Sequence, residues 1–443
     1  MKASVLAFLL LGISSIHCCC DAFLLRSLVN PSPLRSRHSS IICCQAFGTP
    51  SATSDETPAL SKSDAIASSR ATYQTLFTMS EGERLRFQYD FDELVLSAEA
   101  SSSVASTSTL ATTHKTHAVL LIHPIGVGIG RWYYDRLMES LGNDGGGPNT
   151  DETDRIVFLA PDLLGSGSAS APIAADGTDV LEIPLLTVSD WSDQMQDLMA
   201  DYEIRSESKS HPIGRWTVVA NGGCSPIALD VARSVVDGTA PFTSKVTDVV
   251  LSSPPRLPFF LESADVEKVK KSYRTLSGIA GRLFWWYALR KDGNFIQRFS
   301  EKNLVGRPES LGDEWTKNCV AVAKLNSGRS RYSTFSFLAG SLQEGCRRSL
   351  DVLKSSDVRI SFIRGTDKRR NRARSWFWQR QRRRKEQESK SEVEKGSEDR
   401  AEVSIEQHVK ENGNGGDVEY VGGRISLAHE DAKGYAAALR RLL

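Results

Sequence analysis

The stretch WTVVANGGCSPIALDVA, residues 216–232, decides the fold of this chain. An apolar run ends at Asn221, two glycines follow, and an apolar pattern with helical spacing starts after Cys224. A continuous run rich in Val and Ala is typical of a strand buried on both faces, and Ser-Pro is a common helix start. The stretch therefore predicts a strand, a tight turn and a helix, with Gly222 at the tip of the turn.

Similar runs recur along the chain and predict the other core strands of a parallel sheet. They are residues 117–123, 155–162, 246–253 and 358–365. Helical patterns such as 190–202 and 226–236 lie between them, so strand and helix alternate as in a doubly wound α/β protein. The 443 residues are 40% apolar and 25% charged, with a formal charge of +1. This composition fits one large globular α/β domain and gives no global attraction to nucleic acid or membranes.

The N-terminus has the composition of targeting segments. Residues 1–22 combine a lysine, a short apolar core and small residues, as a signal peptide does, and residues 23–45 are rich in Arg and Ser and poor in acids. The Ala22-Phe23 junction between them resembles the bipartite plastid presequence of algae with complex plastids. We therefore expect a plastid protein, and secretion is the alternative. Residues 46–80 are polar and predict a disordered spacer before an α/β domain over 81–443.

Cysteine usage favours the plastid over secretion. Five of the eight cysteines lie in or beside the leader, which leaves Cys224, Cys319 and Cys346 as an odd, widely spaced set. Such a set predicts neither a disulfide framework nor a zinc site. We expect no metal and no cofactor.

Two glycine-rich turns narrow the family. HPIGVGIGRW (123–132) and APDLLGSGS (160–168) each follow a predicted strand. With the turn at Gly222 and the C-terminal GGRISLAHED (422–431), they resemble the α/β-hydrolase superfamily in order and spacing over roughly residues 117–443. The resemblance implies a mostly parallel sheet and a helical lid. A dinucleotide site is the alternative for a strand followed by glycines, but the GxGxxG fingerprint and its distant acid are absent.

The nucleophile position of that family is substituted here. The family's elbow reads GxSxG, and Asn221 to Ser225 fill this window with Gly222 in the place of the nucleophile. The elbow needs a backbone conformation that is strained for other residues by about 1–3 kcal/mol, and glycine adopts it freely. Cys224 is a candidate replacement nucleophile near a helix start, and a small buried residue is its alternative role. For Ser225 we expect helix capping.

The resemblance also locates the base, the acid and the oxyanion loop. Counting back from Glu430 and Asp431, the family's histidine position falls on Ile425, which cannot take a proton. His429 is a weaker candidate base, with an exposed or capping role as its alternative, and Asp367 is a candidate acid shifted by one residue. Four further residues are expected to shape the oxyanion loop or pocket: His123, Pro124, Gly126 and Gly223.

Two segments add to the minimal fold. Residues 256–345 fall where hydrolases insert a lid, and Trp285 and Trp286 lie in a run that is apolar all round, which predicts burial or contact with a lipophilic ligand. Residues 368–417 are low in complexity, and Lys368 to Lys385 hold ten bases and no acid. Bases interleaved with tryptophans suit an anionic membrane surface, and a solvated insertion is the alternative. One such patch on a neutral chain does not predict nucleic-acid binding.

The sequence leaves open whether the chain is an enzyme. One hypothesis is a hydrolase-like protein without serine-hydrolase chemistry that binds a lipophilic small molecule in a lid-covered pocket. A second is an active esterase or lipase-like hydrolase with a non-standard nucleophile such as Cys224. A third is a membrane-surface or scaffold protein that acts through its basic insertion.

Overall fold

The computed structural model describes most of the chain after the leader. It covers residues 67–78, 82, 84–96, 115–143, 155–174, 178, 180, 182–262, 264–286, 294–343, 345–367 and 404–443. The predicted signal peptide and transit-like segment, and the basic run Lys368 to Lys385, lie outside these residues. Within them, none of the helices combines the length and apolar character needed to cross a bilayer.

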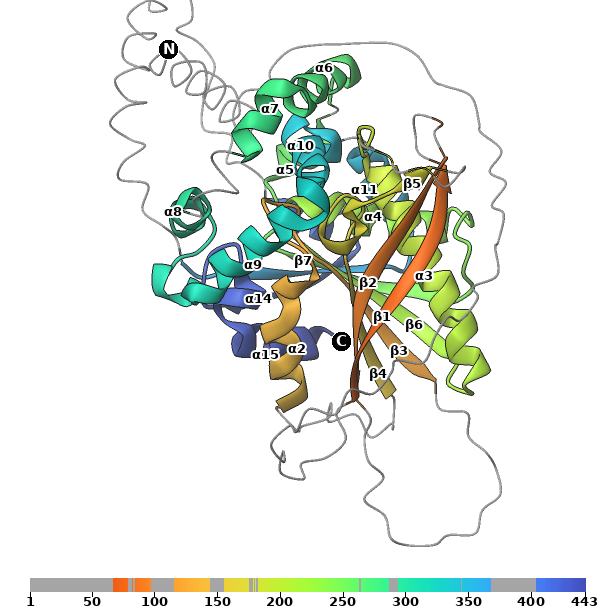
Figure 1. Ribbon diagram of the computed structural model, residues 1–443. Coiled ribbons are helices and arrows are strands. Elements are labelled where there is room, and N and C mark those ends of the chain that lie inside the picture. The colour runs from red at the N-terminus through yellow and green to blue at the C-terminus, as the bar shows by residue number, and fades with distance from the viewer. Residues whose placement is uncertain are drawn as a thin grey trace, which may run out of the picture. The chain divides into compact units, whose positions relative to one another are not determined.

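The described strands form one mixed, mostly parallel sheet (Figure 1). Their bounds are β1 Ala67–Thr78, β2 Arg84–Leu96, β3 Thr116–Ile122, β4 Arg155–Pro161, β5 Ile173–Ala174, β6 Ile213–Asn221, β7 Lys245–Ser252, β8 Arg359–Gly365 and β9 Gly415–Val421. The order is β1-β2-β4-β3-β6-β7-β8-β9, with the short β5 beside β2. The pairs from β4 to β9 are parallel, whereas β1–β2 and β2–β4 are antiparallel.

Helices cover both faces of the sheet. They are α2 Asp135–Asn143, α3 Val188–Ser208, α4 Ser225–Val236, α5 Leu257–Leu261, α6 Val266–Ser277, α7 Ile279–Phe284, α8 Asn294–Asn303, α9 Gly312–Lys324, α10 Arg331–Ala339, α11 Cys346–Leu353, α13 Ile405–Glu411, α14 Leu427–Glu430 and α15 Ala432–Leu442. On one face of the sheet, α4 packs against α3 and α11. On the other face, α2 packs against α15 (Figure 1). This arrangement buries the central strands, so that Leu120, Val219 and Val250 have no exposed surface.

All five core strands that the apolar runs predicted are present, and the predicted α/β class is correct. The strand, turn and helix of the opening stretch are β6, the turn at Gly222 and α4. Residues 256–345, predicted as a lid, hold helices α5 to α10 between β7 and β8. They are called the lid segment below.

Two predicted boundaries are wrong. The spacer expected over 46–80 overlaps β1, which pairs with β2 along its whole length from Ala67 opposite Val95 to Thr78 opposite Arg84. The insertion expected to end at 417 ends by residue 404, because α13 and then β9 follow. The strands β1 and β9 lack the continuous apolar run that marks a buried strand, so their polar composition did not predict them. Hydrogen bonds to a neighbouring strand hold them in the sheet.

Candidate functional site

The turn after β6 has the backbone of a nucleophile elbow. Gly222 has a φ of +57°, in the left-handed region that favours glycine. A Cβ built on Gly222 would meet no atom within 4 Å, so the side chain that is missing here would enter free space. The Ser225 hydroxyl donates to the Gly222 carbonyl at 2.7 Å. It does not cap the helix N-terminus as expected, because Ser225 is already the first residue of α4.

Ile425 lies beside this elbow, where the family resemblance places the catalytic histidine. The Asn221 side-chain amide donates to the Ile425 carbonyl at 3.3 Å. The backbone amides of Ile425 and Ser426 both donate to the Leu304 carbonyl at 3.1 Å. The position therefore carries an aliphatic side chain on a backbone that is bound to the lid segment.

Asp367, the candidate acid, follows β8, which lies between β7 and β9 in the sheet. Its backbone amide donates to the Gly423 carbonyl at 2.9 Å, two residues before Ile425. A Cβ built on Gly306 would be 2.4 Å from an Asp367 carboxylate oxygen, so this carboxylate lies against the backbone of the lid segment. The structure thus brings the elbow, Ile425 and Asp367 to one end of the sheet, and none of the described histidines lies between them.

His123 is fully buried, and both of its ring nitrogens are engaged. The Leu163 amide donates to Nε2 at 3.1 Å, so Nε2 is the acceptor and Nδ1 carries the proton that reaches the Pro124 carbonyl at 3.0 Å. Burial lowers the pKa of His123, which keeps the ring neutral. The ring joins the turns after β3 and β4 and has no lone pair left for a base.

Cys224 is buried in the core, with 1% of its surface exposed. Burial raises the pKa of its thiol to about 12, although a hydrogen bond with the Ile125 backbone opposes the shift. A thiol becomes a nucleophile by losing its proton, and this environment holds the proton in place. The geometry favours the role of a small core residue.

His429 lies inside the protein, not at an exposed helix end. Its Nε2 contacts the Leu311 carbonyl at 3.2 Å, and its ring packs edge-on against Trp315 and Trp132 at centroid distances of 4.7 and 6.2 Å. Burial lowers its pKa to about 4. Because a carbonyl can only accept, Nε2 carries the proton, and His429 packs the lid segment against α14.

Glu430 is a structural acid that the sequence analysis assigned no role. Its side chain is fully buried, and its carboxylate accepts the backbone amides of Gly306, Arg307 and Arg424 at 2.9 to 3.1 Å. The first two amides belong to the lid segment and the third to the turn before Ile425. Its place seven residues after the Gly-Gly pair at 422–423 was the available signal. The sequence alone could not show which amides it binds.

The APDLLGSGS turn is held by Asp162, which is 1% exposed. Its carboxylate accepts the Arg131 amide and guanidinium at 2.9 and 3.1 Å, and the Ser168 amide and hydroxyl at 3.0 and 2.8 Å. Arg131 also pairs with Asp92 at 3.0 Å and Asp90 at 3.7 Å on β2. One buried carboxylate thus joins the two glycine-rich turns, and Arg131 connects them to β2.

The lid segment packs directly on the expected oxyanion loop. The Thr334 hydroxyl on α10 donates to the Gly126 carbonyl at 3.0 Å. A Cβ on Gly223 would be 2.8 Å from the Phe337 ring, also on α10. Pro124 supplies the carbonyl that His123 binds. An aromatic ring of the lid segment therefore borders the elbow.

The two candidate tryptophans of the lid segment differ in how far they are exposed. Trp285 is 1% exposed, donates to the Ala323 carbonyl at 3.3 Å and packs on Phe335 at 5.8 Å. Trp286 is 55% exposed. The prediction of burial or ligand contact describes the first tryptophan, whereas the second faces solvent.

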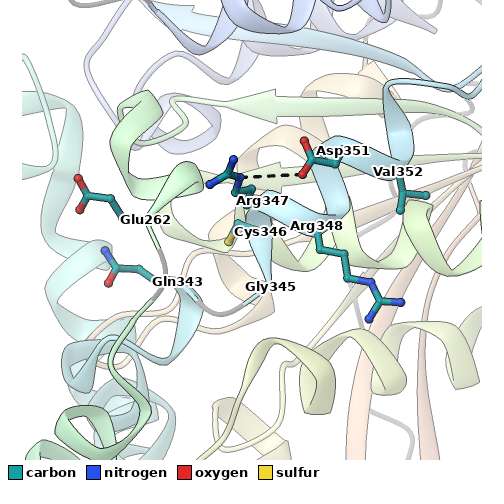
Figure 2. Close-up of a pocket in the computed structure, with 8 residues that line it drawn as sticks. All are labelled: Glu262, Gln343, Gly345, Cys346, Arg347, Arg348, Asp351 and Val352. Carbon is teal, nitrogen blue, oxygen red and sulfur yellow. Dashed lines mark ion pairs between the residues drawn. The ribbon is translucent and has the colours of Figure 1, made fainter. Parts of the chain in front are cut away.

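A surface cavity of about 460 Å³ lies at the start of α11 (Figure 2). Glu262, Cys346 and Arg348 line it, together with Arg347 and Asp351, whose ion pair measures 4.0 Å. Its lining includes no residue of the elbow or of the turns after β3 and β4. This cavity is therefore separate from the candidate site.

Known proteins resemble this chain in structure at low sequence identity. No protein-family model and no curated protein matches the chain. Cfl2 from Burkholderia cenocepacia is similar in structure at 14% identity and a TM-score of 0.44, over 84% of this chain and 95% of that one. The epoxide hydrolase CorEH is similar at 10% identity and a TM-score of 0.43, over 84% of this chain and 98% of that one. A thermophilic esterase from Thermogutta terrifontis is similar at 12% identity and a TM-score of 0.44, over 83% of this chain and 97% of that one.

The chain has the α/β-hydrolase fold. Its mostly parallel sheet, the left-handed glycine turn after β6 and the helices between β7 and β8 are the features that the resemblance implied. Similarity of fold does not assign an activity, which depends on the residues of the site.

Proposed function

We propose that this chain is a plastid protein with the α/β-hydrolase fold that lacks serine-hydrolase chemistry and binds a lipophilic small molecule between the elbow and the lid segment. The observation that carries the proposal is the elbow itself. Gly222 has room for a side chain and supplies none, and Ile425 stands where a base is needed. The plastid location rests on the composition of residues 1–45.

The described histidines support the absence of a base. His123 and His429 are engaged as above, and His117 is bonded to Thr217 at 2.9 Å inside the sheet. His211 follows α3, and His408 lies on α13 with its Nε2 3.2 Å from Asn412. General-base catalysis needs a free lone pair within hydrogen-bond reach of the nucleophile, and the described histidines offer none at the elbow.

Two features support a ligand in the space before Gly222. The Phe337 ring borders the elbow and offers an apolar wall. The buried Asn221 Oδ1 has no hydrogen-bond partner among the described residues. Because buried polar atoms are nearly always satisfied, this acceptor favours a mostly apolar ligand that carries one donor such as a hydroxyl.

The chemical proposal is tested with an activated fluorophosphonate, which labels the nucleophile of serine hydrolases. We expect no labelling of the parent chain and none of Gly222→Ser, since a new hydroxyl without a base stays unreactive. The double variant Gly222→Ser/Ile425→His supplies both groups, and we expect it to label about a hundredfold faster than the single variant. Stoichiometric labelling of the parent at any serine would overturn the proposal.

The binding proposal is tested with a dansyl-labelled fatty acid as the probe. We expect saturable binding to the parent and about tenfold weaker binding to Gly222→Asn, because asparagine tolerates positive φ and its side chain would fill the free space. Gly238→Asn is the matched control, since Gly238 also has a positive φ of 68° and nothing within 4 Å of its built Cβ. Equal affinity in the two variants would contradict a site at the elbow.

A further inference from the structure

The lid segment carries a group of large apolar side chains that face solvent. Ile279, Leu283 and Trp286 are 77%, 61% and 55% exposed, and Phe295 and Phe299 are 37% and 44% exposed. These five residues are called the lid apolar face. Scattered exposed apolar residues are ordinary, but a contiguous group of this size marks an interaction site.

An aromatic contact joins the two helices that carry these side chains. Ile279, Leu283 and Trp286 follow one another at intervals of four and three residues, which places them on one side of α7 and its continuation. Phe295 stacks on Phe299 on α8 with ring centroids 6.1 Å apart, and it contacts Phe284 of α7 at 6.0 Å. Figure 1 shows α7 and α8 at the outer side of the lid segment, away from the sheet.

The helices that carry this face, and α6 beside α7, are rich in bases. Helices α6, α7 and α8 contain seven Lys and Arg residues and only two Glu within their bounds. Among these bases, Arg282 pairs with Glu182. The whole chain is nearly neutral, so the excess of bases is local to these helices. Aromatic and aliphatic side chains beside Lys and Arg are the composition of a surface that lies in the headgroup region of a bilayer.

We propose that the lid apolar face docks on a lipid bilayer with anionic headgroups. Trp286 and its apolar neighbours enter the boundary between headgroups and acyl chains, and the basic residues of α6 and α8 contact the phosphates. A second copy of this chain is a poorer occupant, because two such faces would bring like charges together. The proposal does not rest on the proposed function, since it needs neither an empty nor a filled pocket.

The test is cosedimentation with vesicles of phosphatidylcholine and phosphatidylglycerol. Residues 66–443 suit it, because this compact unit contains every described element and omits the apolar leader. We expect binding that weakens with added salt and is at least about tenfold weaker in Leu283→Ser/Trp286→Ser/Phe299→Ser. The three side chains are exposed or nearly so, and we expect the variant to unfold at the same temperature as the parent.

Two matched variants separate the lid from other sources of binding. Ile204→Ser removes a side chain that is 62% exposed on α3, and should leave binding unchanged. Replacement of the bases of Lys368 to Lys385 by glutamine removes the charge of the insertion. If this change abolishes binding while the lid variant binds normally, the proposal is overturned. Equal binding to pure phosphatidylcholine, or a dimer in solution that the lid variant dissociates, would also overturn it.

Discussion

Replacement of Asp162 by alanine should lower the free energy of unfolding by about 3–5 kcal/mol. The substitution removes four hydrogen-bond contacts to a carboxylate that is 1% exposed. It leaves the part-buried Arg131 and Ser168 amides without that acceptor, and each unsatisfied buried group costs about 1–3 kcal/mol. Arg131 keeps Asp90 and Asp92 as partners, which limits the loss. Urea denaturation followed by tryptophan fluorescence measures the change.

Asp351→Ala is the control for this prediction. Its carboxylate is 72% exposed and forms a long ion pair of 4.0 Å with Arg347. The free energy of unfolding of the variant should therefore lie within about 0.5 kcal/mol of that of the parent. Equal urea midpoints for the Asp162 and Asp351 variants would show that the two turns hold together without the buried carboxylate.

Replacement of Glu430 by glutamine should detach part of the lid segment, at a cost of about 2–4 kcal/mol. The carboxylate accepts amides of Gly306, Arg307 and Arg424, and hydrogen bonds to charged groups are the stronger kind. Glutamine keeps one acceptor oxygen and turns an NH₂ group toward other donors. Hydrogen exchange of residues 304–307 and 424–426, read by mass spectrometry, should accelerate before the rest of the chain.

Glu309→Gln tests whether this effect is specific, because Glu309 is an exposed acid only a few residues from Gly306. Its exchange pattern should match that of the parent. Unchanged protection of Gly306 in the Glu430 variant would mean that packing of the lid segment, not the buried carboxylate, holds this turn.

The sequence predicted those parts of the fold that a single run of residues determines. The core strands were recognisable because a strand buried on both faces is apolar throughout, as Val218 to Ala220 are. The edge strand β9 was not, because only Val421 of its seven residues is buried. Backbone pairing with β8 defines it, and such pairing leaves little trace in composition.

The candidate site, too, was predictable only where a single residue type determines the local structure. The glycine at position 222 predicted a left-handed turn, because few other residues adopt that conformation without strain. The environments of His429 and Glu430 were not predictable, since their partners Leu311, Gly306 and Arg307 lie more than a hundred residues earlier. Only the packing of the lid segment brings these groups together.

The relaxed backbone at Gly222 has a consequence for selection. A serine at this position would carry a positive φ at a cost of about 1–3 kcal/mol, and alone it would return no activity because Ile425 offers no base. A histidine at 425 alone would likewise have no hydroxyl to activate. Under the proposed function, either substitution alone is therefore neutral at best, and the serine lowers stability in a protein that, like most, has little to spare. Under the proposed function, serine-hydrolase activity therefore needs two coordinated substitutions before any gain can be selected.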